Sequence, residues 1–282
     1  MRGENDARPF EADVIVSRRE PRKARLNGDA LRSAEQLRGT FHTLVFTPDR
    51  LAVVKGGPAT RRAYLDRSSG RLFPGRASAG GDYGSALGQR NAALRRVALG
   101  LSSPDALAPW TERVASTGRE LVALRRATAE LLAEPFAEIA ERLGLARATI
   151  VYDGEPPSTE ELDARLERDL ERGSTGLGPH LHDLRIEAAT HDLRTYGSQG
   201  EQRTAVLALV LAEATALTER TGAPPLVLLD DVLSELDAER RLSLAHLLVG
   251  GGQTMITTTS ADALPIEPAQ SLVVAVGTVR EA

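Results

Sequence analysis

The chain has 282 residues, of which 41% are apolar and none is cysteine, and its formal net charge is −4. A chain of this length and apolar content buries a substantial core, in one large domain or two. The missing cysteines exclude disulfides and thiolate metal sites, and no apolar run reaches the roughly 18 residues that span a membrane. The first residues are charged and show no secretory signal, so we expect a cytoplasmic protein without a membrane partner.

Charge is distributed unevenly along the chain. Residues 55–76 carry six basic side chains against one acid, whereas residues 153–171 carry eight acids against two arginines. A run of like charge is most often a solvated face of a protein. The basic run also has the composition of a surface that contacts phosphates.

The first third of the chain reads mainly as sheet. Residues 12–17 alternate as a strand, residues 24–31 form a hairpin around Asn27-Gly28, and Thr43–Phe46 is a short apolar strand. A helix begins at Pro58. Glycines then predict a break over residues 75–84.

The middle of the chain is helical. Apolar residues recur at helical spacing over residues 85–143, and Pro104 and Pro109 divide them into long helices that pair as an antiparallel hairpin. We interpret this part as an inserted helical lobe. A strand follows at residues 149–152, then a short acidic helix and a loop at residues 173–179.

The last third alternates helices with strands. Helices are expected over residues 199–219 and 238–249, and strands over residues 226–229, 254–258 and 272–276. This alternation predicts a parallel sheet with right-handed crossovers, and therefore an α/β fold.

Two acids end the apolar strand of residues 226–229. Asp230 and Asp231 are thereby placed at the carboxyl edge of the sheet, where open α/β sheets bind ligands. One acid at such an edge can ligate Mg²⁺ while its neighbour orients or deprotonates a water molecule. A simple turn would also place two acids there, but it would not explain why Ser234 and Asp237 follow in the string Leu-Leu-Asp-Asp-Val-Leu-Ser-Glu-Leu-Asp.

A second candidate feature is the turn at residues 198–202. Ser198 and Glu201 have the spacing of a capping box, which alone explains a well-started helix. Gly197 and Gly200 flank the polar pair, and glycines allow a backbone to approach a phosphate closely at a helix N-terminus.

Together these motifs resemble those of the ATP-binding-cassette ATPases. Ser198-Gln199-Gly200-Glu201-Gln202 resembles the signature motif, residues 226–230 resemble Walker B, and residues 234–237 resemble the D-loop. Residues 196–204 and 229–237, with the upstream segments 45–49, 61–66 and 83–94, resemble more narrowly the RecF family of bacterial recombination mediators. We call residues 198–202 the signature turn below.

The resemblance implies an ATPase lobe with a mixed sheet and flanking helices, interrupted by the helical lobe. Its expected segments are residues 1–57 and 176–282 for the ATPase lobe and 58–175 for the helical lobe. In the family, two subunits sandwich ATP, clamp single-stranded or gapped duplex DNA, and work with a RecR-type mediator protein. Slow hydrolysis then releases the DNA.

The resemblance also assigns roles to residues. Asp230 would ligate Mg²⁺ and Asp231 would occupy the catalytic, water-activating position. ATP would be contacted by the signature turn and the D-loop, through Ser198, Gln199, Gly200, Gln202, Ser234 and Asp237. Thr258 or Thr259 falls near a switch position, and Arg61 and Arg62 are the expected DNA contacts.

The sequence departs from the family pattern at two places. No phosphate loop G-x-x-x-x-G-K-[ST] occurs, so we expect the chain to start inside the ATPase lobe and to show no saturable ATP binding by itself. In addition, Leu181 and His182 stand where the family has an arginine and an acid. Two alternatives stay open: a truncated module that binds DNA or a partner without ATP turnover, and a non-functional fragment.

Overall fold

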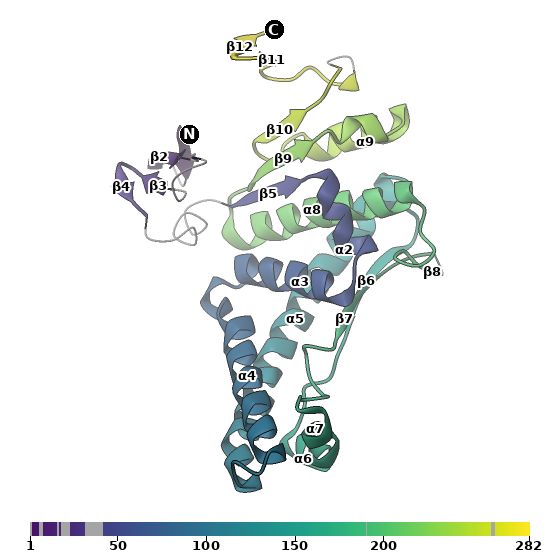
Figure 1. The fold of residues 1–282 in the computed structure, drawn as a ribbon. Coiled ribbons are helices and arrows are strands. Elements are labelled where there is room, and N and C mark those ends of the chain that lie inside the picture. Colours follow the sequence, from purple (N-terminus) through teal and green to yellow (C-terminus); the bar gives the residue numbers. More distant parts are fainter. Residues whose placement is uncertain are drawn as a thin grey trace.

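The computed structural model describes residues 2–5, 8–15, 17, 23–31, 42–189, 191–260 and 263–282. Over these residues the chain is a mixed α/β protein, in which a small parallel sheet and a long central helix carry a helical extension at one end (Figure 1). The α/β class expected from the sequence is confirmed. Within the described residues, no helix is both long and apolar enough to cross a membrane.

The parallel sheet has three described strands in the order β10-β9-β5. These are β5 (Thr43–Phe46), β9 (Leu226–Asp230) and β10 (Thr254–Thr257), and both pairings are parallel. Leu44, Val227 and Leu229 are buried, because helices cover the apolar strands. The predicted parallel sheet is confirmed for these three strands.

Helix α8 (Gln199–Thr221) is the central support of the fold. It begins at a complete capping box made by Ser198 and Glu201, and it ends at Gly222, whose φ of 74° is left-handed. Most of the side chains between these ends are buried, so α8 is apolar nearly all round and packs against β5 and α5. Its position is therefore fixed along its length.

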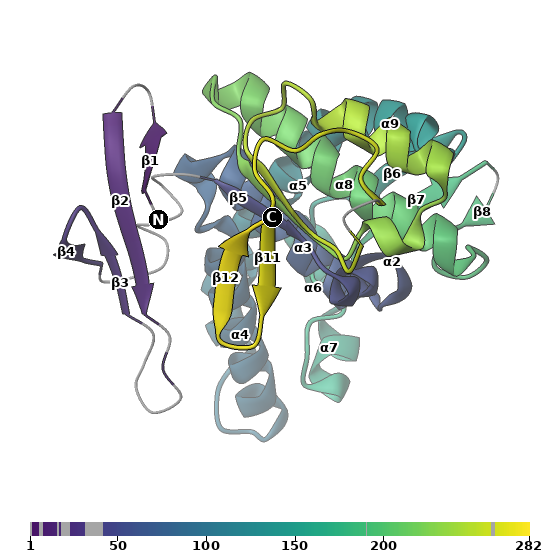
Figure 2. The ribbon, with the colours of Figure 1, turned by 90° about the horizontal axis from the view of Figure 1, so that it is seen from above.

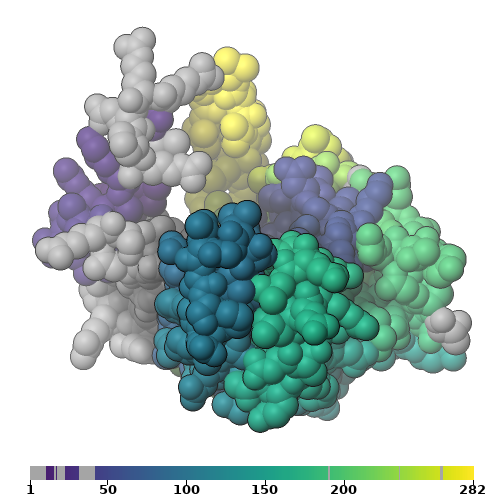
Figure 3. Space-filling model, turned by 60° about the horizontal axis from the view of Figure 1, so that its bottom comes forward, coloured from purple at the N-terminus to yellow at the C-terminus, as the bar shows by residue number. Residues whose placement is uncertain are grey.

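The helical extension is built on an antiparallel pair, α4 (Ala79–Ala98) and α5 (Ala108–Arg142), joined through η3 (Pro104–Leu107). The short helices α6 (Thr159–Ala164) and α7 (Leu166–Arg172) pack beside it, and Figure 3 shows them next to the end of the pair. The predicted hairpin is confirmed. The predicted glycine break is confirmed only in part. Residues 73–78 separate α3 from α4, but Gly80, Gly81 and Gly84 lie inside α4, where Tyr83 and Ala86 pack into a second core.

An antiparallel sheet connects the helical extension with α8. Its strands are β6 (Ala148–Asp153), β7 (Asp183–Ala188) and β8 (His191–Asp192), in that order. β6 was expected from the sequence. β7 was missed, although Leu184, Ile186 and Ala188 alternate with charged residues as in a half-buried strand. β8 leads within a few residues into the signature turn.

Two antiparallel units lie outside this core. The first contains β1 (Arg2–Asn5), β2 (Arg8–Ile15), β3 (Lys23–Leu26) and β4 (Asp29–Ala30), with the predicted Asn27-Gly28 turn in left-handed conformation; position 16 of the predicted strand lies outside the described residues. The second is the hairpin of β11 (Leu272–Ala275) and β12 (Thr278–Glu281), which lies above the parallel sheet in Figure 1, while Figure 2 shows the first unit to one side of the core. The expectation that residues 272–276 join that sheet is therefore wrong: Gly277, at φ 74°, turns the chain back on itself.

The main core extends from the parallel sheet into the helices. It includes residues of α3 (Pro58–Leu72), of the second half of α5, and of β6 and β7. The segment formed by η1 (Pro48–Leu51) and α2 (Ala52–Lys55) packs on α8. Two further short helices, η2 (Pro74–Arg76) and η4 (Leu233–Glu235), connect longer elements, and α9 (Ala238–Leu248) follows η4. Because one core crosses the expected lobe boundaries, the division at residues 57/58 and 175/176 stays a prediction.

Candidate nucleotide site

Asp230 and Asp231 leave β9 at the carboxyl edge of the parallel sheet, and Thr257 of the neighbouring strand joins them. Thr257 Oγ1 donates a hydrogen bond to Asp230 Oδ1 at 2.6 Å and accepts one from the Asp231 backbone N–H at 3.1 Å. The β9–β10 register places Thr257 directly opposite Asp230. One hydroxyl therefore fixes both the metal-ligand candidate and the backbone of the catalytic candidate.

Asp231 combines an unusual backbone conformation with a buried side-chain oxygen that has no partner among the described residues. Its φ of 49° is left-handed, which is costly for a residue with a side chain. Its Oδ1 is buried and has no hydrogen-bond partner among the described residues, while its carbonyl accepts from Ser234 Oγ at 3.0 Å. Backbone strain and an unsatisfied buried oxygen at one residue are typical of a functional position.

The D-loop candidates lie directly beyond these acids. Ser234 is exposed, and Asp237 caps α9 by accepting the Arg240 N–H at 2.9 Å. Val232, Leu233 and Leu236 are buried and hold the turn against the core. A hollow of about 420 Å³ opens beside it, lined by Ser234, Arg241, Thr258, Thr259, Ser260 and Ala263.

The signature turn presents three exposed residues, Ser198, Gln199 and Gly200, at the N-terminus of α8. Ser198 Oγ accepts the Glu201 N–H at 3.2 Å, and Glu201 Oε2 accepts the Ser198 N–H at 2.7 Å, which lowers the pKa of Glu201. A side chain at Gly200 would meet open space. The first backbone N–H groups of a helix have no partner within it, so this end of α8 is suited to an anion.

Gln202 supports the turn from inside. Its side chain is buried, and Nε2 donates to the Leu193 carbonyl at 2.8 Å. Gly197 lies against the same carbonyl, because a Cβ there would sit only 2.5 Å from the Leu193 oxygen. Gln202 is thus directed away from the exposed face formed by residues 198–200, although the sequence grouped it with them.

The two halves of the candidate site lie apart within one chain. α8 has 23 residues and β9 has five, which correspond to lengths of about 34 Å and about 17 Å. α8 runs back along the sheet to the short connection that starts β9 (Figure 1), so the signature turn extends roughly 17 Å beyond the acids. A single γ-phosphate cannot touch both.

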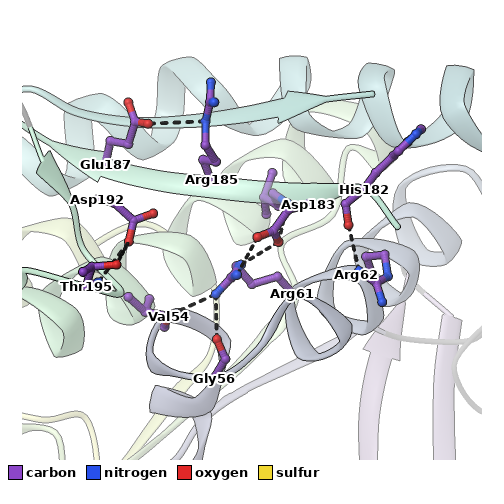
Figure 4. A network of polar contacts seen from close by, with 11 residues as sticks. Val54, Gly56, Arg61, Arg62, His182, Asp183, Arg185, Glu187, Asp192 and Thr195 are labelled. Carbon is purple, nitrogen blue, oxygen red and sulfur yellow. Dashed lines mark hydrogen bonds and ion pairs between the residues drawn. The ribbon is translucent and has the colours of Figure 1, made fainter. Parts of the chain in front are cut away.

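Arg61 and Arg62 have different environments in the structure. Arg61 is 4% exposed, and its guanidinium binds both carboxylate oxygens of Asp183, from Nε at 2.7 Å and from Nη2 at 2.6 Å (Figure 4). Arg62 is half-buried and donates to the His182 carbonyl at 2.8 Å. The buried ion pair gives Arg61 a structural role, whereas Arg62 keeps part of its side chain at the surface.

Thr257 is the site residue that sequence reasoning missed. The sequence marked Thr258 and Thr259 as the switch position, and these two residues line the hollow instead of contacting the acids. The run of threonines was a visible signal. Which of them meets Asp230 depends on strand register, and that register is set by packing.

The chain is similar to known proteins over most of its length. No protein-family model matches the chain. The protein named DNA replication and repair protein RecF from Anaeromyxobacter dehalogenans is 41% identical over 268 residues, covering 88% of this chain and 70% of that protein. Its namesake from Geobacter sulfurreducens is 35% identical over 284 residues, covering 95% and 76%.

Solved structures also resemble the chain over nearly all of its length. A structure described as the recombination mediator protein RecF-ATP in the RecFOR pathway superposes with a TM-score of 0.81 at 28% identity, covering 98% of this chain and 76% of that one. An Smc head bound to the C-winged helix domain of ScpA reaches a TM-score of 0.53 at 16% identity, which is a likeness of fold alone. The chain belongs to the RecF family of DNA replication and repair proteins.

Proposed function

We propose that this protein acts in DNA replication and repair by binding single-stranded and gapped duplex DNA as a dimer whose two chains share ATP. The observation that carries the proposal is the pair of half-sites in one chain, the signature turn and the acids Asp230 and Asp231, which lie too far apart to serve one phosphate. Two chains placed face to face would bring each half against the other. The solved relative is described as RecF-ATP, which supports the choice of nucleotide.

The acids fit a divalent cation. Asp230 is exposed and has one oxygen bound by Thr257, which leaves the other for a hard cation such as Mg²⁺. The buried, unpartnered Oδ1 of Asp231 is suited to accept a proton from a water molecule that attacks the γ-phosphate. Bound Mg²⁺ would neutralise the charge that develops on the phosphate oxygens during this step.

The signature turn fits the γ-phosphate of a nucleotide held by the other chain. Ser198 and Gly200 are exposed at the end of a buried helix, and the helix N-terminus favours negative charge. Gln199 lies on the same face. Ser234 and Asp237, in the D-loop beside the acids, would meet the opposite chain across the interface.

Dimer formation would link nucleotide to DNA. DNA bound by two chains raises their local concentration, so even weak ATP binding joins them at millimolar nucleotide. The solved relatives are described as mediators in the RecFOR pathway, and we extend this to a RecR-type mediator as protein partner. Arg62 remains our predicted DNA contact, whereas the expectation for Arg61 is given up, because its buried guanidinium is bound to Asp183.

A second candidate function is a module that binds DNA or a partner without ATP turnover. The observation that favours it is the sequence itself, in which no G-x-x-x-x-G-K-[ST] motif occurs among the 282 residues. Such a loop supplies most of the backbone N–H groups that hold the β- and γ-phosphates.

Fluorescence anisotropy with labelled gapped duplex DNA tests the two functions, over a series of salt concentrations and with or without millimolar Mg²⁺-ATP. The dimer proposal predicts that Mg²⁺-ATP tightens binding at least about fivefold, the lower end of typical coupling between two ligands. Ser198→Arg, which fills the exposed turn, should abolish this gain while leaving the nucleotide-free affinity unchanged.

The control variant is Ser85→Arg, which makes the same change of charge and size at an exposed position on α4, outside the site. It should keep the gain. Equal affinity with and without Mg²⁺-ATP would support the module. Absence of salt-dependent DNA binding would contradict the dimer proposal and a module that binds DNA, and would leave only a module that binds a protein partner.

A further inference from the structure

Arg61 joins two parts of the molecule that are distant in sequence. Besides its two bonds to Asp183, its Nη1 donates to the Gly56 carbonyl at 2.8 Å and to the Val54 carbonyl at 3.3 Å (Figure 4). Val54 and Gly56 belong to the segment that follows the carboxyl end of β5, through η1 and α2. Asp183 is the first residue of β7. A single buried guanidinium therefore links the ligand-facing edge of the parallel sheet to the antiparallel sheet.

From Asp183 a short series of bonds leads to the signature turn. Ile186 of β7 accepts the Leu193 N–H at 3.0 Å, and the Leu193 carbonyl accepts both the Gln202 side chain at 2.8 Å and the Gly197 N–H at 3.2 Å. Asp192 of β8 caps the intervening turn through the Thr195 N–H at 3.0 Å. The turn is thus supported through β7 and β8 as well as through α8.

The loop that precedes β7 is held by further contacts of the same kind. Arg62 binds the His182 carbonyl, and Arg125 Nη1 donates to the Pro179 carbonyl at 2.7 Å. The Tyr152 hydroxyl lies 2.9 Å from His182 Nδ1. These contacts hold residues 179–182 against α3 and α5, and Asp183 then ends the loop at a fixed point.

We propose that Arg61 and Asp183 form a positioning pair that sets the place of the signature turn relative to the carboxyl edge of the parallel sheet. The proposal rests on the proposed role of the signature turn as a phosphate contact. Arginine is needed at position 61 because only a planar guanidinium reaches a carboxylate with two parallel bonds and still donates to two carbonyls. Displacement of the segment after β5 would move Asp183, and with it the turn.

The chain contains a matched control for this pair. Arg90 and Asp169 also form an arginine–aspartate pair, at 2.8 Å, but both of its members are buried, whereas Asp183 is 30% exposed, and the pair joins α4 to α7 at the far end of the helical extension. Neither residue contacts β7 or β8 in any described bond. If a substitution acted only by breaking an ion pair, it should loosen the segments next to that pair. The signature turn should then respond no more to a change in one pair than to a change in the other.

The first test is hydrogen exchange followed by mass spectrometry on the complete chain without nucleotide. Asp183→Asn keeps the shape of the side chain and removes its charge, and Asp169→Asn does the same at the control pair. We expect amide exchange over residues 191–203 to rise at least about tenfold in Asp183→Asn, and to stay unchanged in Asp169→Asn. Asp169→Asn should instead speed exchange over residues 162–176.

A spectroscopic label gives a readout that global destabilisation does not move. Because the chain has no cysteine, Gln199→Cys offers a single attachment point for a nitroxide at the exposed signature turn. The spectrum should show greater nitroxide mobility in the Asp183→Asn background and unchanged nitroxide mobility in the Asp169→Asn background. Arg61→Lys, which keeps the charge but not the paired bonds, is the milder variant and should give an intermediate spectrum.

The proposal is overturned if the label and the exchange at residues 191–203 are unchanged in folded Arg61→Lys or Asp183→Asn, or if the control pair alters them equally. No nucleotide is present in these measurements. A negative result therefore leaves the shared ATP site standing, and failure of the DNA-binding test does not touch the positioning pair.

Discussion

At the residue scale, Gly197, just before the signature turn, and Gly200, within it, are glycine for different structural reasons. A Cβ at Gly197 would lie 2.5 Å from the Leu193 carbonyl, whereas the nearest atom to a Cβ at Gly200 is Ser198 Oγ at 4.0 Å. Gly197 is thus required by packing, while Gly200 leaves room on the exposed face. The capping box explains Ser198 and Glu201 but not this open space.

We therefore predict opposite results for two alanine substitutions. Gly197→Ala should lower the free energy of unfolding by about 1–3 kcal/mol, because the added methyl overpacks the turn. Gly200→Ala should change it by less than about 0.5 kcal/mol. Urea denaturation followed by circular dichroism measures both, and equal stability of the two variants would contradict the packing at Gly197.

The histidines at the junction of α4, α5 and β7 make stability depend on pH. His180 Nε2 lies 3.0 Å from the Thr175 carbonyl and Nδ1 lies 2.7 Å from the Tyr83 hydroxyl, an arrangement that a neutral ring satisfies. Burial lowers the pKa of His180 and of His182 below the ordinary 6.5, and nearby Arg62 and Arg125 add to this effect.

The sign of the pH dependence follows from these shifts. As pH falls below about 6.5, the unfolded chain takes up protons that the folded chain refuses, so the free energy of unfolding decreases until the pH passes the folded-state pKa values. The double variant His180→Gln/His182→Gln should lose part of this slope between about pH 7 and about pH 5. Urea midpoints at each pH provide the measurement, and an unchanged slope in the double variant would contradict it.

At the element scale, the helical extension depends on a buried polar network. Arg90 is completely buried on α4 and binds Asp169 at 2.8 Å and Thr175 Oγ1 at 2.7 Å, and its neighbour Asn91 accepts the Thr175 N–H at 2.8 Å. These contacts explain why an arginine can be buried on α4 beside an asparagine. They join α4 to α7 and to the loop that follows it.

Removal of one member should be costly. Asp169→Ala leaves Arg90 buried without its counter-ion, so we expect a loss of about 3–5 kcal/mol in the free energy of unfolding. Thermal or urea unfolding of the complete chain measures this loss. Glu167→Ala, at an exposed position on the same helix, is the control and should stay near the wild type; a loss below about 1 kcal/mol in Asp169→Ala would contradict the role of the pair.

The elements that sequence predicted well are those with strong periodicity or definite end signals. The signature helix, the Asn27-Gly28 turn and the strands of residues 43–46 and 226–229 follow from local pattern alone. The N-terminal half of α4 does not, because tertiary packing overrides poor helix propensity there. β7 has the alternation of a half-buried strand, so its pattern was visible in the sequence and was missed. The positions of Thr257 and Arg61 depend on strand register and on contacts between residues far apart in sequence.

At the scale of the whole molecule, the chain carries two half-sites that lie apart from each other. Asp230 and Asp231 are fixed by the parallel sheet, and the signature turn is fixed by α8 and by the positioning pair. Because the two half-sites are separated by roughly 17 Å along α8, one phosphate cannot contact both, and the motifs together imply a dimer. A nucleotide between two copies would complete each half with the other.

The most direct measurement of this claim mixes two variants that are each defective. Ser198→Arg removes the signature half and Asp230→Ala removes the proposed Mg²⁺ ligand, and each alone should lose the effect of Mg²⁺-ATP on binding to gapped duplex DNA. In an equal mixture, half of the dimers pair one chain of each kind and contain one intact shared site, so about a quarter of the sites recover. The account predicts partial recovery of the Mg²⁺-ATP effect in the mixture, and a mixture as inactive as its two components would contradict a site shared between chains.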